Sequence, residues 1–145
     1  MKPIDSVEIV ENFWAAVWKA QNPKAIDRFM VDDFVLTTGG VDVVSKEKFK
    51  QWASAFMARI NDFQFEVLET FQNRDGSRVA SRWRVSGKNN GLMGTPADQR
   101  HISFTGIAVW EVRGDGKLCH NWVERSFFEL YQQLHPAVAR GQETG

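Results

Sequence analysis

The stretch of sequence that decides the fold is the last third of the chain, residues 87–134: GKNNGLMGTPADQRHISFTGIAVWEVRGDGKLCHNWVERSFFELYQQL. In order, it has the patterns of a polar loop, a strand, an Asp-Gly turn, a second strand and a short apolar helix. The expected bounds of these elements are 88–100, 101–113, 114–116, 117–125 and 126–134. Two long strands closed by a helix predict one wall of a hollow, with the polar loop at its rim.

The residues before this stretch add helices first and then more strands. Helix starts are expected at Asp5 or Ser6, at Pro23 and at Ser45, with Asp32-Asp33 ending the second helix. The strands are expected over residues 34–38, from Phe63 to Phe71 and over residues 78–87, with an Asn73 to Gly76 hairpin turn before the last. Helices followed by antiparallel strands predict an α+β domain in which the helices pack on one face of the sheet.

Balanced charge and a single cysteine limit the classes of function. The chain has 145 residues, with 18 Lys and Arg against 18 Asp and Glu. Non-specific binding to nucleic acid or to an anionic membrane needs a basic excess, which this chain lacks. Cys119 stands alone, which excludes an internal disulfide and a cysteine-based metal cluster. We expect no nucleic-acid partner, no membrane partner and no cofactor.

The length suits one domain over residues 1–135, followed by a polar tail over residues 136–145 that we expect to be disordered. The first residues lead into a helix without the apolar core of a signal peptide. No apolar run approaches the ~20 residues that span a bilayer. We therefore expect a cytoplasmic protein.

From residue 82 to residue 134 the motifs resemble those of the SnoaL-like polyketide cyclases, which belong to the nuclear transport factor 2-like superfamily. The matching segments are Arg-Trp at 82–83, Gly-x-His-x-Gly at 87–91, Gly-x-Pro-x-x-x-Arg at 94–100, Phe-Thr-Gly-Ile at 104–107 and Gly-Lys-Ile-x-x-x-Trp-x-x-x-Asp at 116–126. The resemblance implies an α+β cone in which N-terminal helices pack on a strongly curved mixed or antiparallel sheet that encloses a pocket. This fold hosts cyclases, isomerases, dehydratases, epoxide hydrolases and proteins without enzymatic activity.

The sequence departs from the pattern of these enzymes at the residues that carry their chemistry. The histidine of Gly-x-His-x-Gly is Asn89 here, and the Asp that serves as acid or base in such cyclases is Ser126. The basic Asp of the related ketosteroid isomerases falls at Thr38. A serine hydroxyl without an activating base does not accept a substrate proton near neutral pH. Neither position that holds a catalytic carboxylate in the related enzymes holds one in this chain.

Strand alternation offers a substitute carboxylate. If residues 117–125 form a regular strand, His120, Trp122, Glu124 and Ser126 share one face. If that face lines the pocket, Glu124 stands among aromatic rings, an environment that suits a general acid or base. We therefore expect Glu124 to transfer the proton, with His120 and Ser126 as the other catalytic candidates. Alternatively, Glu124 pairs with a neighbouring arginine (Arg82, Arg84 or Arg125), or a bulge turns it outward.

Aromatic and polar side chains supply the candidates for substrate binding. They are Trp14, Trp18, Thr38, Trp83, Asn89 and Trp122. Each has a plainer alternative, which is core packing for the rings, turn chemistry for Asn89 and strand propensity for Thr38. We expect no metal site, because no spacing of the three histidines and nearby acids matches a metal-ligand pattern.

Three functions stay open on these grounds. The first is a cofactor-free acid/base enzyme of the cyclase, isomerase or dehydratase type acting on a small hydrophobic carbonyl compound. The second is a binding protein for a small hydrophobic molecule, and a purely structural dimerisation module is a third. The direction of Glu124 separates the first two, since a carboxyl group inside the pocket favours the enzyme. We also expect a homodimer that covers the open face of the sheet, to which we assign Arg82, Arg84, Asn121 and Val123.

Overall fold

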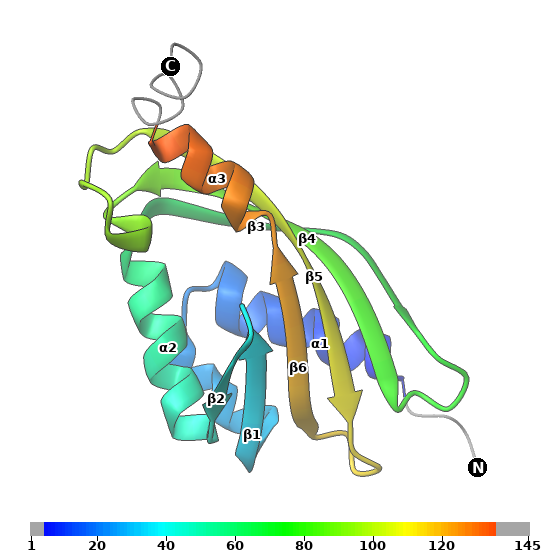
Figure 1. Cartoon of the computed structure of the whole chain (residues 1–145). Coiled ribbons are helices and arrows are strands. Elements are labelled where there is room, and N and C mark those ends of the chain that lie inside the picture. The colour runs from blue at the N-terminus through cyan, green and yellow to red at the C-terminus, as the bar shows by residue number, and fades with distance from the viewer. Residues whose placement is uncertain (1–4, 136–145) are drawn as a thin grey trace.

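Six strands form one curved sheet in the order β2-β1-β6-β5-β4-β3, and helices cover one of its faces (Figure 1). This computed structural model describes residues 5–135. The strands are β1 (Met30–Thr38), β2 (Val41–Val44), β3 (Ile60–Gln72), β4 (Arg78–Asn89), β5 (His101–Val112) and β6 (Leu118–Arg125). β1 and β6 run parallel, whereas the other neighbouring strands are antiparallel. The sheet is therefore mixed, and the predicted α+β cone is confirmed.

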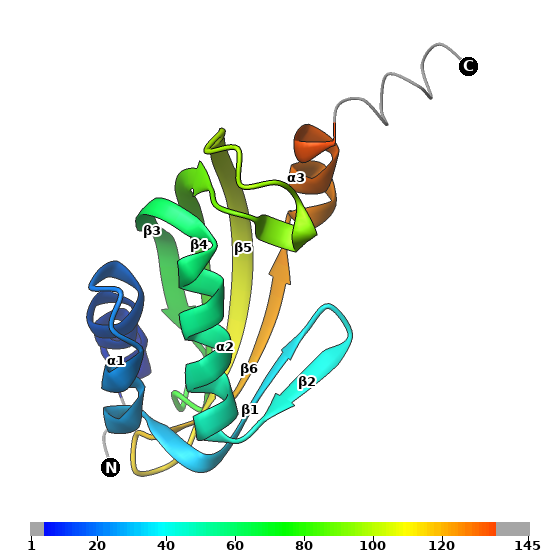
Figure 2. The same cartoon turned by 90° about the vertical axis from the view of Figure 1, so that its left-hand side faces the viewer.

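Two of the described helices begin at a side chain that caps a free backbone N–H group. They are α1 (Ser6–Phe13), the π-helix η1 (Trp14–Lys19), the 3-10 helices η2 (Pro23–Arg28) and η3 (Leu92–Gly94), α2 (Lys46–Ala58) and α3 (Phe127–Leu134). The Asp5 carboxylate accepts a hydrogen bond from the backbone N–H of Glu8 at 3.1 Å, and Ser45 Oγ accepts one from Lys48 at 3.2 Å. Figure 2 shows α1 and α2 lying along the face of the sheet that the helices cover, which we call the inner face.

Several element predictions need correction. Asp32 and Asp33 do not end a helix but lie within β1, where both side chains are exposed and Asp32 pairs with Lys46 at 3.0 Å. β2 was not predicted, although it pairs with β1 across the Gly39-Gly40 turn. The first predicted helix is continuous in the chain but changes from α to π geometry at Trp14. The predicted disordered tail lies outside the described residues.

Aromatic rings fill the space between the inner face and the helices. The largest fully buried side chains include Trp110, Phe13, Phe34 and Phe49. Their rings meet mainly edge-on or tilted, as in the pair of Phe13 and Trp110 with centroids 4.9 Å apart. This packing gives the inner face an apolar, ring-lined character. None of the helices within residues 5–135 is long and apolar enough to cross a membrane.

Candidate functional site

The phase of side chains along β6 decides which residues can line the inner space. Asn121 and Val123 are buried, whereas Trp122 is 36% exposed and Glu124 is exposed. The pairing of β6 with β5 places Arg125 opposite Gly106, which is buried on the inner face. β6 therefore presents Asn121, Val123 and Arg125 to the inner face, and His120, Trp122 and Glu124 to the opposite face, which we call the outer face.

The prediction that Glu124, His120 and Trp122 line the inner pocket is wrong in its geometry. His120 Nε2 lies 2.8 Å from Thr37 Oγ1, and its ring stacks on that of Trp122 with centroids 3.9 Å apart. Strand alternation was predicted correctly, but its phase was set from Ser126, which lies beyond the last strand residue. For the same reason Asn121 and Val123 point inward, while Arg82 and Arg84 are exposed on the outer face as predicted.

Ser126 connects the end of β6 to the start of α3. Its backbone N–H donates to the carbonyl of Thr105 at 2.9 Å, and its Oγ accepts from the backbone N–H of Thr105 at 3.0 Å. The residue occupies the N-cap position of α3, but its side chain makes no capping hydrogen bond to that helix. These contacts hold the end of β6 against β5, and none of them activates the hydroxyl as a nucleophile.

The other predicted binding residues lie inside the molecule. Trp14 Nε1 donates to Ser81 Oγ at 3.0 Å, and Trp18 stacks near the rings of Phe63 and Phe65. Trp83 is buried over Gly106, and its Nε1 has no hydrogen-bond partner within the described part of the chain. The first two rings have the contacts of core residues. Trp83 keeps an unpaired donor on the inner side of the sheet.

Asn89 organises the loop at the end of β4. Its Oδ1 accepts hydrogen bonds from the backbone N–H groups of Gly91 and Leu92, at 3.1 and 2.9 Å. Its Nδ2 donates to Thr95 Oγ1 at 2.9 Å and to the carbonyl of Pro96 at 3.1 Å. Because the side chain is fully buried and its oxygen and nitrogen are both engaged, Asn89 has the contacts of a loop-bracing residue.

Arg125 is the inner-face residue that the sequence analysis missed as a site. Its guanidinium lies over the ring of Phe127 at 4.0 Å and over those of Trp52 and Phe56 at 5.5 Å each. Its Nη2 donates to Thr38 Oγ1 at 3.2 Å. Desolvation by these rings lowers the pKa of Arg125 to about 10, against a weaker opposing effect of Glu124. The group therefore stays positively charged near neutral pH.

Within residues 5–135 this cation has no carboxylate in ion-pair contact. No Asp or Glu among residues 5–135 forms an ion pair with Arg125, whereas Arg82 pairs with Glu69 at 2.7 Å and Arg78 with Glu111 at 3.1 Å. In the same range, no Asp, Glu or His side chain is buried. Among residues 5–135 the inner face thus offers one half-buried cation, the Thr38 hydroxyl and aromatic rings, with no buried carboxylate or imidazole beside them. Arg125 follows Asn121 and Val123 at alternate positions of the strand. This placement of a charged residue on the buried face was the signal that could have identified the site.

Further buried polar atoms on the inner face lack partners. Trp110 Nε1 and Asn121 Oδ1 have none among the described residues, and the pairing of β5 with β6 sets their residues opposite each other. Unsatisfied buried groups are uncommon in folded proteins and call for an explanation such as a bound ligand or water. Within residues 5–135, no three His, Cys, Asp or Glu side chains gather in a way that could hold a metal ion.

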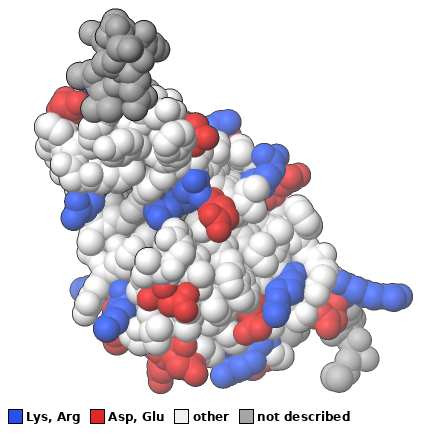
Figure 3. All heavy atoms as spheres, viewed as in Figure 1, with Lys and Arg blue, Asp and Glu red and all other residues white. Residues whose placement is uncertain are grey.

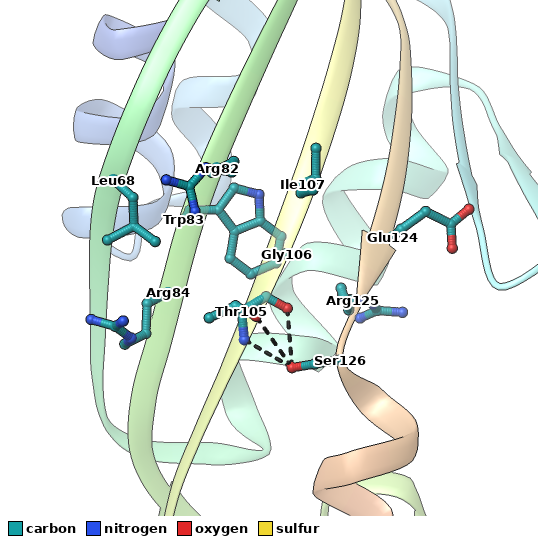
Figure 4. Close-up of a pocket in the computed structure, with 10 residues that line it drawn as sticks. All are labelled: Leu68, Arg82, Trp83, Arg84, Thr105, Gly106, Ile107, Glu124, Arg125 and Ser126. Carbon is teal, nitrogen blue, oxygen red and sulfur yellow. Dashed lines mark hydrogen bonds between the residues drawn. The ribbon is translucent and has the colours of Figure 1, made fainter.

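The outer face carries a separate hollow of about 320 Å³ above Gly106 (Figure 4). Its rim includes Leu68, Arg84, Ile107 and Glu124. Trp83 and Gly106 also line it, and a Cβ added at Gly106 would lie as close as 2.3 Å to atoms of the Trp83 indole. Glu124 borders this outer hollow, on the face of the sheet opposite the buried rings.

One family model matches most of the chain, and several solved structures share its fold. The sequence model of the SnoaL-like polyketide cyclases matches residues 8–134. The fold is similar to that of a protein from Jannaschia sp. CCS1 provisionally assigned as a SnoaL-like polyketide cyclase, at TM-score 0.81 and 15% identity over 92% of this chain and 95% of that one. A provisionally assigned polyketide cyclase from Acidithiobacillus ferrooxidans gives TM-score 0.76 and 21% identity over 94% and 99%.

Another protein of similar structure is named for a different activity. It is an epoxide hydrolase of the LEH-like type from M. tuberculosis, with TM-score 0.70 and 16% identity over 92% of this chain and 89% of that one. At these identities the structural likeness shows the fold alone. No curated protein sequence matches the chain.

Proposed function

Because the chain belongs to the SnoaL-like polyketide cyclase family, we propose that it binds a small molecule with an apolar body and an acidic or carbonyl oxygen. Arg125 anchors that oxygen on the inner face of the sheet, and the surrounding rings contact the apolar body. In this proposal the protein holds its ligand without converting it.

The observation that carries the proposal is the unpaired guanidinium inside an aromatic shell. Taking a charge out of water is costly unless another group compensates it. Cation–π contacts with Trp52, Phe56 and Phe127 compensate in part, at about 0.5–2 kcal/mol each. A ligand oxygen would supply the missing anionic or polar partner, and the donors that Thr38 does not use remain available to it.

The direction of Glu124 supports binding over acid/base catalysis. Its carboxyl group is exposed on the outer face, so a ligand on the inner face does not meet it. A general base must come within hydrogen-bond reach of the proton that it removes. Within the described residues the inner face holds no buried carboxylate or imidazole that could replace it.

A matched pair of probes tests the proposal. Isothermal titration calorimetry would compare 2-naphthoate with its neutral analogue 2-naphthylmethanol. A charge-assisted hydrogen bond contributes about 1.5–3 kcal/mol, so we expect the wild type to prefer naphthoate by about 10- to 100-fold. Arg125→Met should lose this preference, and Arg125→Lys should keep part of it.

The control variant is Arg84→Met, which removes an exposed arginine from the outer face. It should leave both affinities unchanged. Equal binding of the two probes to the wild type, or an unchanged preference in Arg125→Met, would overturn the role of Arg125 as the anchor.

The pairing of Arg125 with Thr38 favours a second candidate function. The Arg125 guanidinium and the Thr38 hydroxyl lie side by side, and two neighbouring donors can stabilise the oxyanion of an enolate, which is the developing charge in polyketide-type cyclisation and isomerisation. Exchange of the α-hydrogen of benzoylacetone in D2O, followed by NMR, reports this activity. Exchange that wild type accelerates and Arg125→Met does not would favour the enzyme, and exchange at the buffer rate with both proteins would favour binding alone.

A further inference from the structure

Two buried polar atoms without partners belong to residues that face each other across neighbouring strands. Trp110 on β5 and Asn121 on β6 are opposite each other in the strand pairing, and the two residues are 0% and 4% exposed. Trp110 Nε1 and Asn121 Oδ1 form no hydrogen bond with each other or with another group among residues 5–135. A donor and an acceptor on paired residues of the inner face therefore remain available to a third group.

The pair has apolar neighbours. The Trp110 indole lies against the rings of Phe13 and Phe34, with centroids 4.9 and 6.2 Å away. On the other side of β6, Asn121 pairs with Leu36, which is buried. A buried polar group that loses its water without gaining a partner is destabilising. A polar group from outside the chain explains both atoms at once.

The chemistry of the two atoms selects that group. Trp110 Nε1 can only donate a hydrogen bond, and Asn121 Oδ1 can only accept one. A hydroxyl group does both, because its oxygen accepts while its hydrogen is donated. A carboxylate only accepts and an ammonium group only donates, so each would leave one of the two atoms unpaired. The pair is complementary to a hydroxyl, which either a ligand or a water molecule supplies.

The pair lies on the same face as Arg125, at a distance that one small molecule can span. Arg125 follows Asn121 by four residues on β6, and Thr38, which accepts from Arg125 Nη2, pairs with Val123 between them. At about 3.3 Å per residue, the two polar points are about 7–13 Å apart along the strand. A molecule of two fused rings has a suitable length.

Small side chains line the sheet between the two polar points. The inner-face residues of β5 before Trp110 are Gly106 and Ala108, and Ala108 pairs with Val123 on β6. The indole of Trp83 lies over Gly106 at one end of this stretch, and Trp110 stands at the other. A strip of small residues between two indoles suits the flat apolar body of a ligand.

Resting on the function proposed above, we infer that the molecule held at Arg125 carries a hydroxyl group at its far end, which binds between Trp110 and Asn121. The hydroxyl oxygen accepts from Trp110 Nε1, and its hydrogen is donated to Asn121 Oδ1. The ligand is thus a hydroxylated acid or carbonyl compound with its two oxygens at opposite ends of an apolar body. Trp110 and Asn121 determine specificity, because a ligand without the hydroxyl leaves both atoms unpaired.

Probes that differ at one position test the hydroxyl site. Calorimetry on the full chain would compare 6-hydroxy-2-naphthoate with 2-naphthoate and with 6-methoxy-2-naphthoate, which can accept at that position but cannot donate. We expect the wild type to bind the hydroxy compound ~10-fold or more tightly than 2-naphthoate, since two neutral hydrogen bonds are gained. The methoxy compound should bind no more tightly than 2-naphthoate.

Variants assign the effect to the two residues. Asn121→Leu removes the acceptor at similar volume, so it should reduce the preference for the hydroxy compound to about twofold or less and leave 2-naphthoate affinity nearly unchanged. Trp110→Phe removes the donor and should act in the same direction. Asn12→Leu is the control, because Asn12 is exposed on α1. Circular dichroism checks the fold, and Asn121→Leu carries the test if Trp110→Phe does not fold.

The outcomes separate this inference from the function on which it rests. If 2-naphthoate binds in an Arg125-dependent way and the hydroxyl adds nothing, the hydroxyl site is overturned and the anchor stands. A crystal structure of the hydroxynaphthoate complex with a water molecule between Trp110 and Asn121 would likewise reduce the pair to a structural water site. An unchanged preference in Asn121→Leu would also overturn the inference, and failure of all three probes to bind would overturn both proposals.

Discussion

At the scale of single residues, Arg125 shows a conflict between stability and function. Its side chain gives up hydration to lie among three rings. It gains one hydrogen bond to Thr38, and no carboxylate of residues 5–135 forms an ion pair with it. Apolar residues at buried charged positions are often as stabilising as the charges or more so. Residues that lower stability in this way are typical of functional sites. The proposed binding role would explain why a charge occupies this position.

Replacing Arg125 with methionine should make the protein more stable. We expect Arg125→Met to raise the free energy of unfolding by about 1–2 kcal/mol, because the uncompensated charge is removed while the side-chain volume is nearly kept. Urea denaturation followed by tryptophan fluorescence measures the change. Arg84→Met, on the exposed outer face, should stay within about 0.5 kcal/mol of the wild type. A clear loss of stability in Arg125→Met would make Arg125 a structural residue.

At the scale of elements, the contact between β4 and β5 depends on a glycine. Gly106 pairs with Trp83 in register, and an added Cβ would come within 2.3 Å of the indole. Gly106 also pairs with Arg125 on its other side. The absence of a side chain on β5 therefore lets the Trp83 ring lie flat across the inner face, beside the strand that carries the guanidinium.

Adding a single methyl group at this position should disturb the sheet. We expect Gly106→Ala to lower the free energy of unfolding by about 1–3 kcal/mol, the usual cost of overpacking a filled core. Gly114→Ala is the matched control, because nothing lies within 4 Å of an added Cβ there. Thermal and urea denaturation of both variants give the comparison. Equal changes in the free energy of unfolding for the two substitutions would show that the Trp83 ring can move aside without destabilising the protein.

The elements were predictable from sequence to the extent that local patterns determine them. The strand at residues 101–113 was found within a residue of its observed bounds, and the helix after Ser45 within a residue of its observed start, because alternation and capping are local signals. β2 was missed because its four residues carry too short a pattern to predict a strand without the pairing to β1. The phase of β6 was missed because it depends on cross-strand partners such as Trp110, opposite Asn121. The predicted site residues depended on which side chains of β6 point inward. Glu124 was therefore expected on the inner face, where Arg125 lies.

At the scale of the whole molecule, one sheet separates two surfaces of different character. The inner face presents Arg125, Thr38 and buried rings toward the helices, whereas the outer face presents exposed apolar side chains such as Trp122 among small groups of charged ones (Figure 3). Because side chains alternate along a strand, adjacent residues of β6 serve opposite faces. Trp122 and Arg125 are close in sequence, yet ligand binding and the homodimer that we expect on the outer face need not share a residue.

Because of this separation, we expect two tryptophan substitutions to weaken different properties of the protein. Trp52→Leu removes a ring that lies over the Arg125 guanidinium, so we expect it to weaken 2-naphthoate binding by about 10-fold while leaving association of copies unchanged. Trp122→Ala removes the exposed outer-face ring, so we expect it to weaken association and to change naphthoate affinity by less than about twofold. Calorimetry and sedimentation equilibrium on the same preparations measure both quantities. If Trp122→Ala weakened naphthoate binding as much as Trp52→Leu, the ligand would lie on the outer face and the assignment of the two faces would be reversed.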